Sequence, residues 1–565
     1  MKTRIGRPLS LLSHALVCAL LLWGASVALA QAAAPYRIAY QLSMPRPATH
    51  LFEVQIEIET PAPVAAIDVQ MPKWSPGRYA VYDFAKNVQE FNAASGVCPP
   101  VAKCERGPSL PITRVDTQTW SIQTRGATGV TVAYKVFADD LSGTFSQLDE
   151  RHANYNGASV FAYVVGHKPD PVTLRIEPPP GWRVVNGWTE QTDQREWRFP
   201  NYDLLIDTPT EIAPNWTLDE FTVDGKSYRV VIHSFADERG QRKSLVRDIE
   251  KIVRAEIAMW GQPDLDSYTF LMHFGDEKSG DGMEHLTSTQ IITPGALGDQ
   301  QGYEDALDTA AHEFFHVWNV KRLRPVELGP WDFTRPLNTR SLWIAEGITN
   351  YYGHLMQRRA GSWRDEHLYR ALAGQIAAIE NAPGSRLMSA EESSLLAPFI
   401  DGAPHAQETN LRQTTISYYI KGETLGLVLD LLIRGKTNGK RSLDDVLRRM
   451  YEEFYLHSSN SSYYLRGRGY TTDDFMRAAS EVAGADFADF FARHVRGVEP
   501  PPYDEALAQV GLKLVKGEAS SANQAGRAYR IEELKEASTP ARERRRAWLR
   551  GRRQEQEAEG RSRRQ

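Results

Sequence analysis

Residues 310–325 read AAHEFFHVWNVKRLRP and contain the pattern H-E-x-x-H at His312, Glu313 and His316. On an α-helix, residues four apart lie one above the other on the same face, so both imidazoles can bind one metal ion. Glu313 would then stand beside the ion and handle the proton of a metal-bound water. The alternative is an amphipathic helix whose histidines form ordinary hydrogen bonds in the core. The spacing predicts a zinc-dependent hydrolytic centre, provided that a third ligand exists.

Zinc held by two histidines needs another protein ligand and leaves its fourth position to water. The carboxylates downstream are Glu327, Asp332 and Glu346. Glu346 lies in the apolar run LWIAEG, where a lone carboxylate would be buried, and a buried charge is costly unless it is paired or binds a metal. Glu327 and Asp332 lie in a proline-rich connection and are easier to solvate. Glu346 is therefore the preferred third ligand, and exposure at a helix edge is the alternative.

The composition is that of a folded protein with more than one domain. The chain has 565 residues, of which 42% are hydrophobic and 24% charged, which is enough for two or three domains with sizeable cores. The formal net charge of −5 argues against nucleic acid as the main partner.

The N-terminus has the features of a secretory signal peptide. Three basic residues precede the apolar run HALVCALLLWGASVALA, which ends in the A-x-A pattern Ala28-Leu29-Ala30. This pattern predicts a signal peptide over residues 1–30, cut between Ala30 and Gln31, with an uncleaved membrane anchor as the alternative. No other stretch reaches the ~18 apolar residues that cross a bilayer. We expect a periplasmic or secreted protein without stable membrane insertion.

Two cysteines remain after such a cut, Cys98 and Cys104, in the loop sequence GVCPPVAKCERG. In an exported protein this spacing predicts a local disulfide, and it excludes a C-x-x-C redox motif.

Residues 31–225 have the sequence pattern of an all-β domain. The runs FEVQIEIET, TVAYKVFA, SVFAYVVG and VTLRIE are strand-like, with β-branched residues and turns between them. They predict an N-terminal β-sandwich-like domain in which no catalytic cluster is visible.

The pattern changes to helical near residue 240. One helical face carries Leu245, Ile249, Ile252, Val253 and Ile257. SYTFLMHFG follows as a buried strand, and further helices are expected around residues 310–320, 341–360, 416–434 and 441–496. A sheet followed by a helical body predicts a catalytic domain over residues 226–500 and a multidomain α+β fold overall.

Residues 501–565 show a weaker pattern of helix and strand periodicity. Residues 541–565 include ten arginines and four glutamates and almost no apolar residues. Such a composition buries too little surface to fold alone, so the sequence predicts a basic disordered tail.

Four blocks carry a family resemblance: MPKWSPGRYAVYDFAKNV, GDGMEHLTST, HEFFHVWNVKRLRP and LWIAEGITNYY. With them, residues 35–515 closely resemble the M61 family of metallopeptidases, the glycyl aminopeptidase family. The resemblance implies a gluzincin with a thermolysin-like, mainly helical zinc peptidase domain behind a β domain. It implies one zinc per chain with His312, His316 and Glu346 as ligands and Glu313 as general base. The ligand types alone do not exclude another divalent ion.

The same resemblance implies two further sites. Glu284, with Gly282 before it in GDGMEH, matches a loop whose glutamate grips the free α-amine of the substrate in related aminopeptidases. A buried ammonium is best satisfied by a carboxylate, although a surface charge is the alternative for Glu284. Asp281 adds a negative charge that either strengthens amine binding or points to solvent. Tyr419 in YYIKG matches a tyrosine that donates a hydrogen bond to the oxyanion, and Tyr418 is its neighbour.

Members of this family usually carry a C-terminal PDZ domain, and GLKLV resembles the approach to one. The glycine-rich loop and later strands of that domain are missing, so we expect no functional PDZ domain in this chain. Three explanations fit the arginine-rich end: a truncation, a frameshift or a genuine basic tail.

The expected function is an exported zinc metallopeptidase acting on peptides, an aminopeptidase that releases small N-terminal residues such as glycine or alanine. The family name alone supplies that preference. One alternative is an endopeptidase with the same zinc site, which needs no amine anchor at Glu284. Another is a non-catalytic peptide-binding protein on a peptidase scaffold. The sequence does not fix the oligomeric state.

Overall fold

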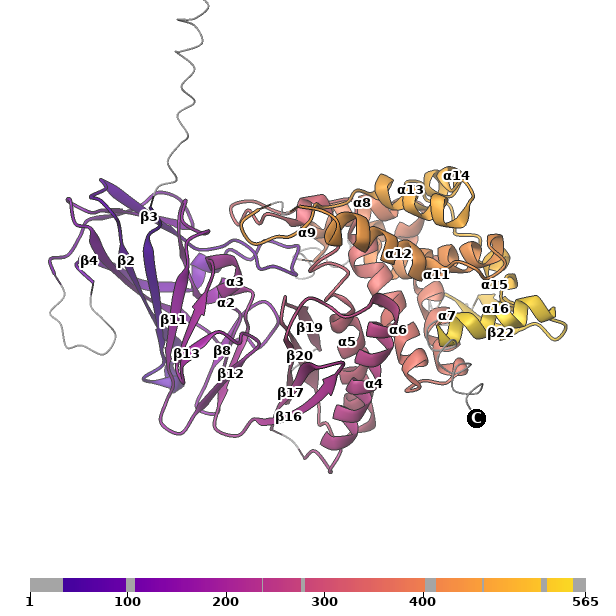
Figure 1. Cartoon of the computed structure of the whole chain (residues 1–565), viewed down its shortest axis with the longest axis horizontal. Coiled ribbons are helices and arrows are strands. Elements are labelled where there is room, and N and C mark those ends of the chain that lie inside the picture. The colour runs from indigo at the N-terminus through magenta and orange to yellow at the C-terminus, as the bar shows by residue number, and fades with distance from the viewer. Residues whose placement is uncertain are drawn as a thin grey trace, which may run out of the picture.

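The computed structural model describes residues 34–97, 107–235, 237–275, 280–401, 413–459, 462–519 and 526–551. A β-rich N-terminal domain lies at one end, a helical body at the other, and a five-stranded sheet between them (Figure 1). This arrangement confirms the predicted multidomain α+β fold. The predicted signal peptide and the pair Cys98 and Cys104 lie outside the described residues.

Three sheets make up the N-terminal domain. The first has seven strands in the order β13 (Gln191–Asp193), β14 (Glu196–Phe199), β11 (Val172–Glu177), β1 (Arg37–Ser43), β2 (Leu51–Glu59), β7 (Gly129–Phe137) and β4 (Val88–Ser95). The second has the order β10 (Tyr163–Val164), β3 (Ala66–Gln70), β6 (Thr119–Gln123) and β5 (Ile112–Arg114). The third has the order β12 (Arg183–Asn186), β15 (Thr210–Ala213), β9 (Ala153–Tyr155) and β8 (Gln147–Leu148). Burial alternates along β2, as expected for a strand with one face on the core.

One predicted strand is largely wrong. SVFAYVVG, residues 159–166, contributes only Tyr163–Val164 to a sheet. The preceding Asn156 instead caps the short helix α2 (Gly157–Val160), its side-chain oxygen accepting a hydrogen bond from the backbone N–H of Ala158. An asparagine cap satisfies a helix N-terminus, so the local backbone favours a helical turn there over an extended strand.

The central sheet has five strands in the order β16 (Thr217–Val223), β17 (Lys226–Ser234), β18 (Ser267–Gly275), β20 (Ser288–Pro294) and β19 (Asp281–Glu284). Strands β17, β18 and β20 are parallel, whereas β16 and β19 are antiparallel edge strands. The β16–β17 hairpin spans the predicted domain boundary at residues 225 and 226, so this sheet begins at Thr217.

The short helix α3 (Tyr202–Ile206) packs in the N-terminal domain, whereas α4 (Arg242–Trp260) and α5 (Gln300–Phe315) pack against the central sheet. The helical body comprises α6 (Thr349–Ala360), α7 (Asp365–Asn381), α8 (Ala390–Leu395), α9 (Ala397–Ile400), α11 (Tyr418–Lys436), α12 (Leu443–Tyr451), α13 (Thr472–Ala483), α14 (Ala488–Phe490), α15 (Tyr503–Ala508) and α16 (Thr539–Arg550). The predicted apolar face of α4 is confirmed, since all five of its residues are buried. Within the described part of the chain, no helix combines the length and the apolar character that crossing a bilayer requires.

The two domains interlock through side chains that cross between them. Phe333, from the connection before α6, is 1% exposed and packs in the core of the N-terminal domain. Its ring lies 5.1 Å from that of Trp74, whose indole N–H donates to the backbone oxygen of Asp332 at 2.9 Å. In the other direction, Tyr79 of the N-terminal domain belongs to the core of the helical body. The interface therefore consists of core residues from both domains.

The C-terminal segment folds onto the helical body. Strands β21 (Leu512–Ala519) and β22 (Arg527–Glu533) form a hairpin, and α16 follows it. The predicted disordered tail is therefore wrong for residues 541–550. Trp548 and Leu549 are buried, and the indole N–H of Trp548 donates to the hydroxyl of Tyr351 at 2.7 Å. These two apolar residues dock a helix whose other positions are largely charged.

We expect Trp548→Ala to destabilise the helical body by about 3–5 kcal/mol, because it removes a fully buried aromatic ring and leaves a cavity. Trp548→Phe retains most of the apolar area and should lose little more than the hydrogen bond, about 1 kcal/mol. Urea unfolding followed by circular dichroism measures both. Equal midpoints for the wild type and Trp548→Ala would contradict the docking of α16.

Candidate metal centre

The two histidines of the H-E-x-x-H motif meet at the end of α5. The helix buries Ala306, Ala310 and Phe314 on the side that faces the core, which leaves the histidine face toward the neighbouring helices. His312 lies in its last turn and His316 is the residue that caps it. Their Nε2 atoms are 3.0 Å apart, and His316 is 1% exposed. The predicted geometry of an i, i+4 pair is thus present.

The carboxylate of Glu346 lies close to both imidazoles. Its Oε2 atom lies 3.5 Å from His312 Nε2 and 3.3 Å from His316 Nε2. Glu346 belongs to a π-helical turn, Trp343–Ile348, directly before α6. Turns of this type concentrate at functional sites because the extra residue redirects one side chain. The other two carboxylates bond elsewhere: Glu327 accepts from Thr339 and Asp332 from Thr334.

Asn319 connects the two elements that carry these groups. Its backbone oxygen accepts a hydrogen bond from His316 Nδ1 at 2.7 Å, which directs Nε2 toward Glu346. Its side-chain amide donates to the backbone oxygen of Ile344 at 3.0 Å and to the hydroxyl of Thr349 at 3.0 Å. One buried residue therefore sets both the orientation of His316 and the position of the turn that bears Glu346.

Two glycines allow the turn of Glu346 to approach α11. A Cβ atom on Gly347 would lie 2.4 Å from the Cα of Gly422, and one on Gly422 would lie 2.2 Å from the backbone oxygen of Trp343. Any side chain at either position would push the two elements apart. Since Tyr419 lies one turn before Gly422 on α11, this contact also holds that tyrosine near the histidines.

The three side chains fit a zinc ion. Ligand atoms arranged as a tetrahedron around zinc, with bonds of ~2.0–2.1 Å, are roughly 3.3 Å apart, close to the separations found here. Burial alone would lower the pKa of His316, yet Glu346 raises it to about 10. The carboxylate thus requires positive charge between itself and the imidazoles, which a proton or a metal ion can supply. The hydrogen bond at His316 Nδ1 is the outer contact that metal-binding histidines usually make.

Glu313 faces the same space from α5. It is 5% exposed, and its Oε2 atom has no hydrogen-bond partner among the described residues. Burial raises the pKa of Glu313 well above its ordinary value, and the nearby carboxylates of Glu284 and Glu346 raise it further. A carboxyl group with a raised pKa is a stronger proton acceptor than an ordinary carboxylate, as a general base requires.

Glu284 and Gly282 lie on the edge strand β19, opposite Glu313. Carboxylate oxygens of Glu284 and Glu313 and a ring nitrogen of His316 all lie within 4.8 Å of one another. A Cβ atom on Gly282 would lie 2.1 Å from Glu313 Oε1, so a side chain at this position would displace the Glu313 carboxylate. Glu284 is 5% exposed, which removes the surface-charge alternative.

The N-terminal domain contacts the part of the site formed by β19. Asp281 accepts hydrogen bonds from Arg78 and from the backbone N–H of Gly143, so its charge fastens β19 to that domain. Gly77, with φ of 85°, comes so close that a Cβ atom there would lie 2.7 Å from Glu284 Oε2. The loop that carries Gly77 and Arg78 therefore packs directly against Glu284.

Two tyrosines lie beside the three side chains that could hold a metal ion. The ring of Tyr419 is 6.3 Å from that of His312, and burial followed by the charge of Glu346 raises the pKa of its hydroxyl well above the ordinary value. Tyr79 donates a hydrogen bond from its hydroxyl to Glu346 Oε1. Sequence reasoning missed Tyr79, although the block SPGRY that contains it was part of the family resemblance. Tyr418 instead donates to Asp401 at 2.7 Å.

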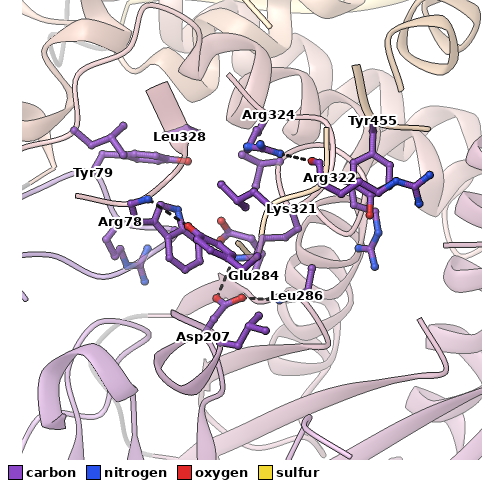
Figure 2. A pocket seen from close by; sticks show the side chains of 18 of the residues that line it. Arg78, Tyr79, Asp207, Glu284, Leu286, Lys321, Arg322, Arg324, Leu328 and Tyr455 are labelled. Carbon is purple, nitrogen blue, oxygen red and sulfur yellow. Dashed lines mark hydrogen bonds and ion pairs between the residues drawn. The ribbon is translucent and has the colours of Figure 1, made fainter. Parts of the chain in front are cut away.

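A pocket of about 160 Å³ opens beside this part of the site (Figure 2). Tyr79 and Glu284 line it together with Lys321, whose ammonium group pairs with Asp207 at 3.0 Å. The rest of the lining comes from both domains and combines apolar side chains with charged ones. The apolar ones include Trp74, Leu286, Leu328, Trp331 and Leu337, and the charged ones include Arg78, Asp264, Arg322, Arg324 and Arg466. The pocket therefore presents apolar surface beside fixed charges of both signs.

Comparisons with known proteins agree with this architecture. The family model of the peptidase M61 N-terminal domain matches residues 39–214, and that of the M61 glycyl aminopeptidase matches residues 305–425. An aminopeptidase N family protein from Idiomarina loihiensis superposes with a TM-score of 0.76 at 27% identity, covering 86% of this chain and 81% of that one. No curated protein matches the sequence.

An M1 zinc metallopeptidase from Deinococcus radiodurans also superposes, with a TM-score of 0.47 at 13% identity over 83% of this chain and 96% of that one. That likeness is too distant to inform the site. The fold and the family matches define a metallopeptidase. The two M61 matches lie in order and together cover just over half of the chain, and the chain belongs to the M61 peptidase family.

We expect Asn319→Ala to weaken zinc binding by about 10–100-fold, the usual effect of removing a residue that orients metal ligands. The variant loses the bonds to Ile344 and Thr349 but keeps the backbone oxygen that accepts from His316. Zinc titration of chelator-stripped protein measures the change. Asn338→Ala, at an exposed asparagine, is the matched control, and equal affinities in the two variants would contradict the role of Asn319.

Proposed function

We propose that this chain is an exported zinc aminopeptidase that releases small N-terminal residues, such as glycine or alanine, from peptides. The observation that carries the proposal is the convergence of His312, His316 and Glu346 beside the buried carboxylates of Glu313 and Glu284. The signal-peptide pattern over residues 1–30 supports export to the periplasm or the medium.

His312, His316 and Glu346 would hold the zinc ion through Nε2, Nε2 and Oε2. Zinc bound there supplies a Lewis acid and lowers the pKa of bound water toward neutrality. Glu313 Oε2 takes a proton from the attacking water and delivers it to the leaving amine. The missing hydrogen-bond partner of Oε2 among the described residues supports this role, because the atom is available for water or substrate.

Glu284 is suited to receive the N-terminal ammonium of the substrate. Two buried carboxylates within 4.8 Å of each other, Glu284 and Glu313, make the space between them favourable for a cation. Gly77 packs against Glu284 from the N-terminal domain, which limits the room beside the carboxylate. A buried carboxylate with little room beside it supports removal of N-terminal residues over cleavage inside a peptide.

Tyr419 is suited to stabilise the developing oxyanion through a hydrogen bond from its phenol. Its raised pKa supports this role, since a donor must keep its proton while the carbonyl oxygen gains charge. Tyr79 donates its hydrogen bond to Glu346 instead, so it is suited to position the proposed metal ligand.

We expect purified mature protein to hydrolyse glycyl- and alanyl-p-nitroanilide but not their N-acetylated forms. Glu313→Gln should lower kcat by about 10²–10⁴-fold, because the proton acceptor is lost while the fold and metal ligands remain. Glu284→Gln should raise KM for the free-amine substrates, because the carboxylate that pairs with the ammonium is gone. Chromogenic assays under steady-state conditions measure all of these.

Cleavage of the acetylated substrates would identify an endopeptidase instead. Failure to cleave any substrate, with zinc bound at His312 and His316, would identify a peptide-binding protein on a peptidase scaffold. Either result would overturn the aminopeptidase assignment.

Tyr419→Phe should lower kcat by roughly 10²–10³-fold with little change in KM or zinc content, the effect of removing one oxyanion donor. Tyr79→Phe should act differently, weakening zinc binding and recovering most of kcat at saturating zinc. Parallel kinetics and zinc titrations of the two variants separate these roles. An unchanged kcat in Tyr419→Phe would assign oxyanion stabilisation to another group.

A further inference from the structure

A second cluster of metal-binding side chains lies away from the site at His312. His152, Glu211, His233 and His273 converge in the interior, and their four donor atoms lie within 4.8 Å of one another. Each side chain is buried, with 3% or less of its residue surface exposed. The family resemblance implied one zinc per chain and gave no role to any of these residues.

The cluster joins the two domains. His152 directly precedes β9, and Glu211 lies on β15, both in the third sheet of the N-terminal domain. His233 and His273 lie opposite each other on the parallel strands β17 and β18 of the central sheet. Figure 1 shows these two sheets beside each other, and the cluster occupies the place where they meet.

The distances within the cluster suit a single small cation. Glu211 Oε1 lies 3.1 Å from His152 Nδ1 and 2.9 Å from His233 Nδ1. His233 Nδ1 is 3.2 Å from His273 Nδ1. These separations match the edges of a tetrahedron of ligands around zinc, which are roughly 3.3 Å long for bonds of ~2.0–2.1 Å.

The outer hydrogen bonds determine which ring nitrogens carry protons. His152 Nε2 contacts Gln147 Oε1 at 2.8 Å, and His233 Nε2 contacts Asn215 Oδ1 at 3.1 Å. Amide oxygens only accept, so both Nε2 atoms are donors. In the neutral rings, each Nδ1 then directs a lone pair at the carboxylate of Glu211. Acceptors facing one another at these distances repel unless positive charge lies between them.

Further contacts hold the cluster in place. Asn154 donates its side-chain N–H to Glu211 Oε2 at 2.8 Å, and Gln290 donates to Asn154 Oδ1 at 2.8 Å. Glu211 Oε1 is thereby turned toward the histidines. The ring of Phe235 covers the three imidazoles, with centroid separations of 5.4, 4.7 and 5.4 Å. Ligands that are oriented by outer hydrogen bonds and covered by apolar side chains are typical of metal sites in proteins.

We propose that His152, Glu211, His233 and His273 form a second zinc site, which is structural and fastens the N-terminal domain to the central sheet. All four positions are filled by protein side chains, whereas a catalytic site keeps one position open. The complete burial of the cluster also leaves no path for a substrate. Because the ligands come from four strand ends in two domains, zinc here fixes the angle between the domains.

The test is a zinc count on the intact mature chain by mass spectrometry after removal of loosely bound metal. We expect two zinc ions per wild-type chain and one in His312→Gln/His316→Gln, where the first site is disabled. Glu211→Gln should also bind one and keep peptidase activity when zinc is supplied. A wild-type count of one, together with none in His312→Gln/His316→Gln, would overturn the proposal.

Cobalt substitution locates the remaining ion. In His312→Gln/His316→Gln, Co²⁺ should give the intense visible absorption of tetrahedral coordination, and adding His233→Gln should abolish it. An unchanged spectrum would place the ion elsewhere and overturn the proposal. If the triple variant does not fold, as judged by gel filtration, chelation of His312→Gln/His316→Gln decides: its thermal midpoint should fall by several degrees, and an unchanged midpoint would also overturn the proposal.

Discussion

The charge of Glu346 is the constraint on which the arrangement of this site depends. Its carboxylate is 2% exposed, and a buried ion without partners costs several kcal/mol even after the surroundings relax. The structure places two imidazoles and the phenol of Tyr79 around it. His316 in turn lowers the pKa of Glu346 well below its ordinary value, against the effect of burial. A carboxylate kept ionised between two imidazoles is chemically prepared for a divalent cation.

Backbone packing holds that charge where the imidazoles can reach it. Gly347 and Gly422 let two helical elements touch at their main chains, and side chains at these positions would separate Glu346 from His312. Asn319 then ties the histidine helix to the turn that carries Glu346. Sterics therefore explain why glycine follows Glu346 and lies one turn after Tyr419. A precise site depends on rigid supporting contacts of this kind.

The sequence predicted the parts of the site that depend on local periodicity. His312 and His316 followed from helical spacing, and the choice of Glu346 over Glu327 and Asp332 followed from the cost of burying a charge. Tyr79 could not be found this way, because it lies 267 positions from Glu346 and meets it only through domain packing. The prediction of a disordered tail was wrong at residues 541–550 for a related reason. An average over many arginines hid Trp548 and Leu549, which suffice to dock α16.

Local sequence patterns predict least about the junction of the two domains, because its contacts join residues that lie far apart in the chain. Arg78 and Gly143 hold Asp281, and Gly77 packs against Glu284, so the N-terminal domain forms one wall of the cleft. The buried histidines and Glu211 join the same two domains at a second place. Together with the packing of Phe333 against Trp74, these contacts join the two domains at several separate places. The β domain is therefore a structural part of the site, since a hinge at this junction would move Tyr79 and Gly77 away from the carboxylates they contact.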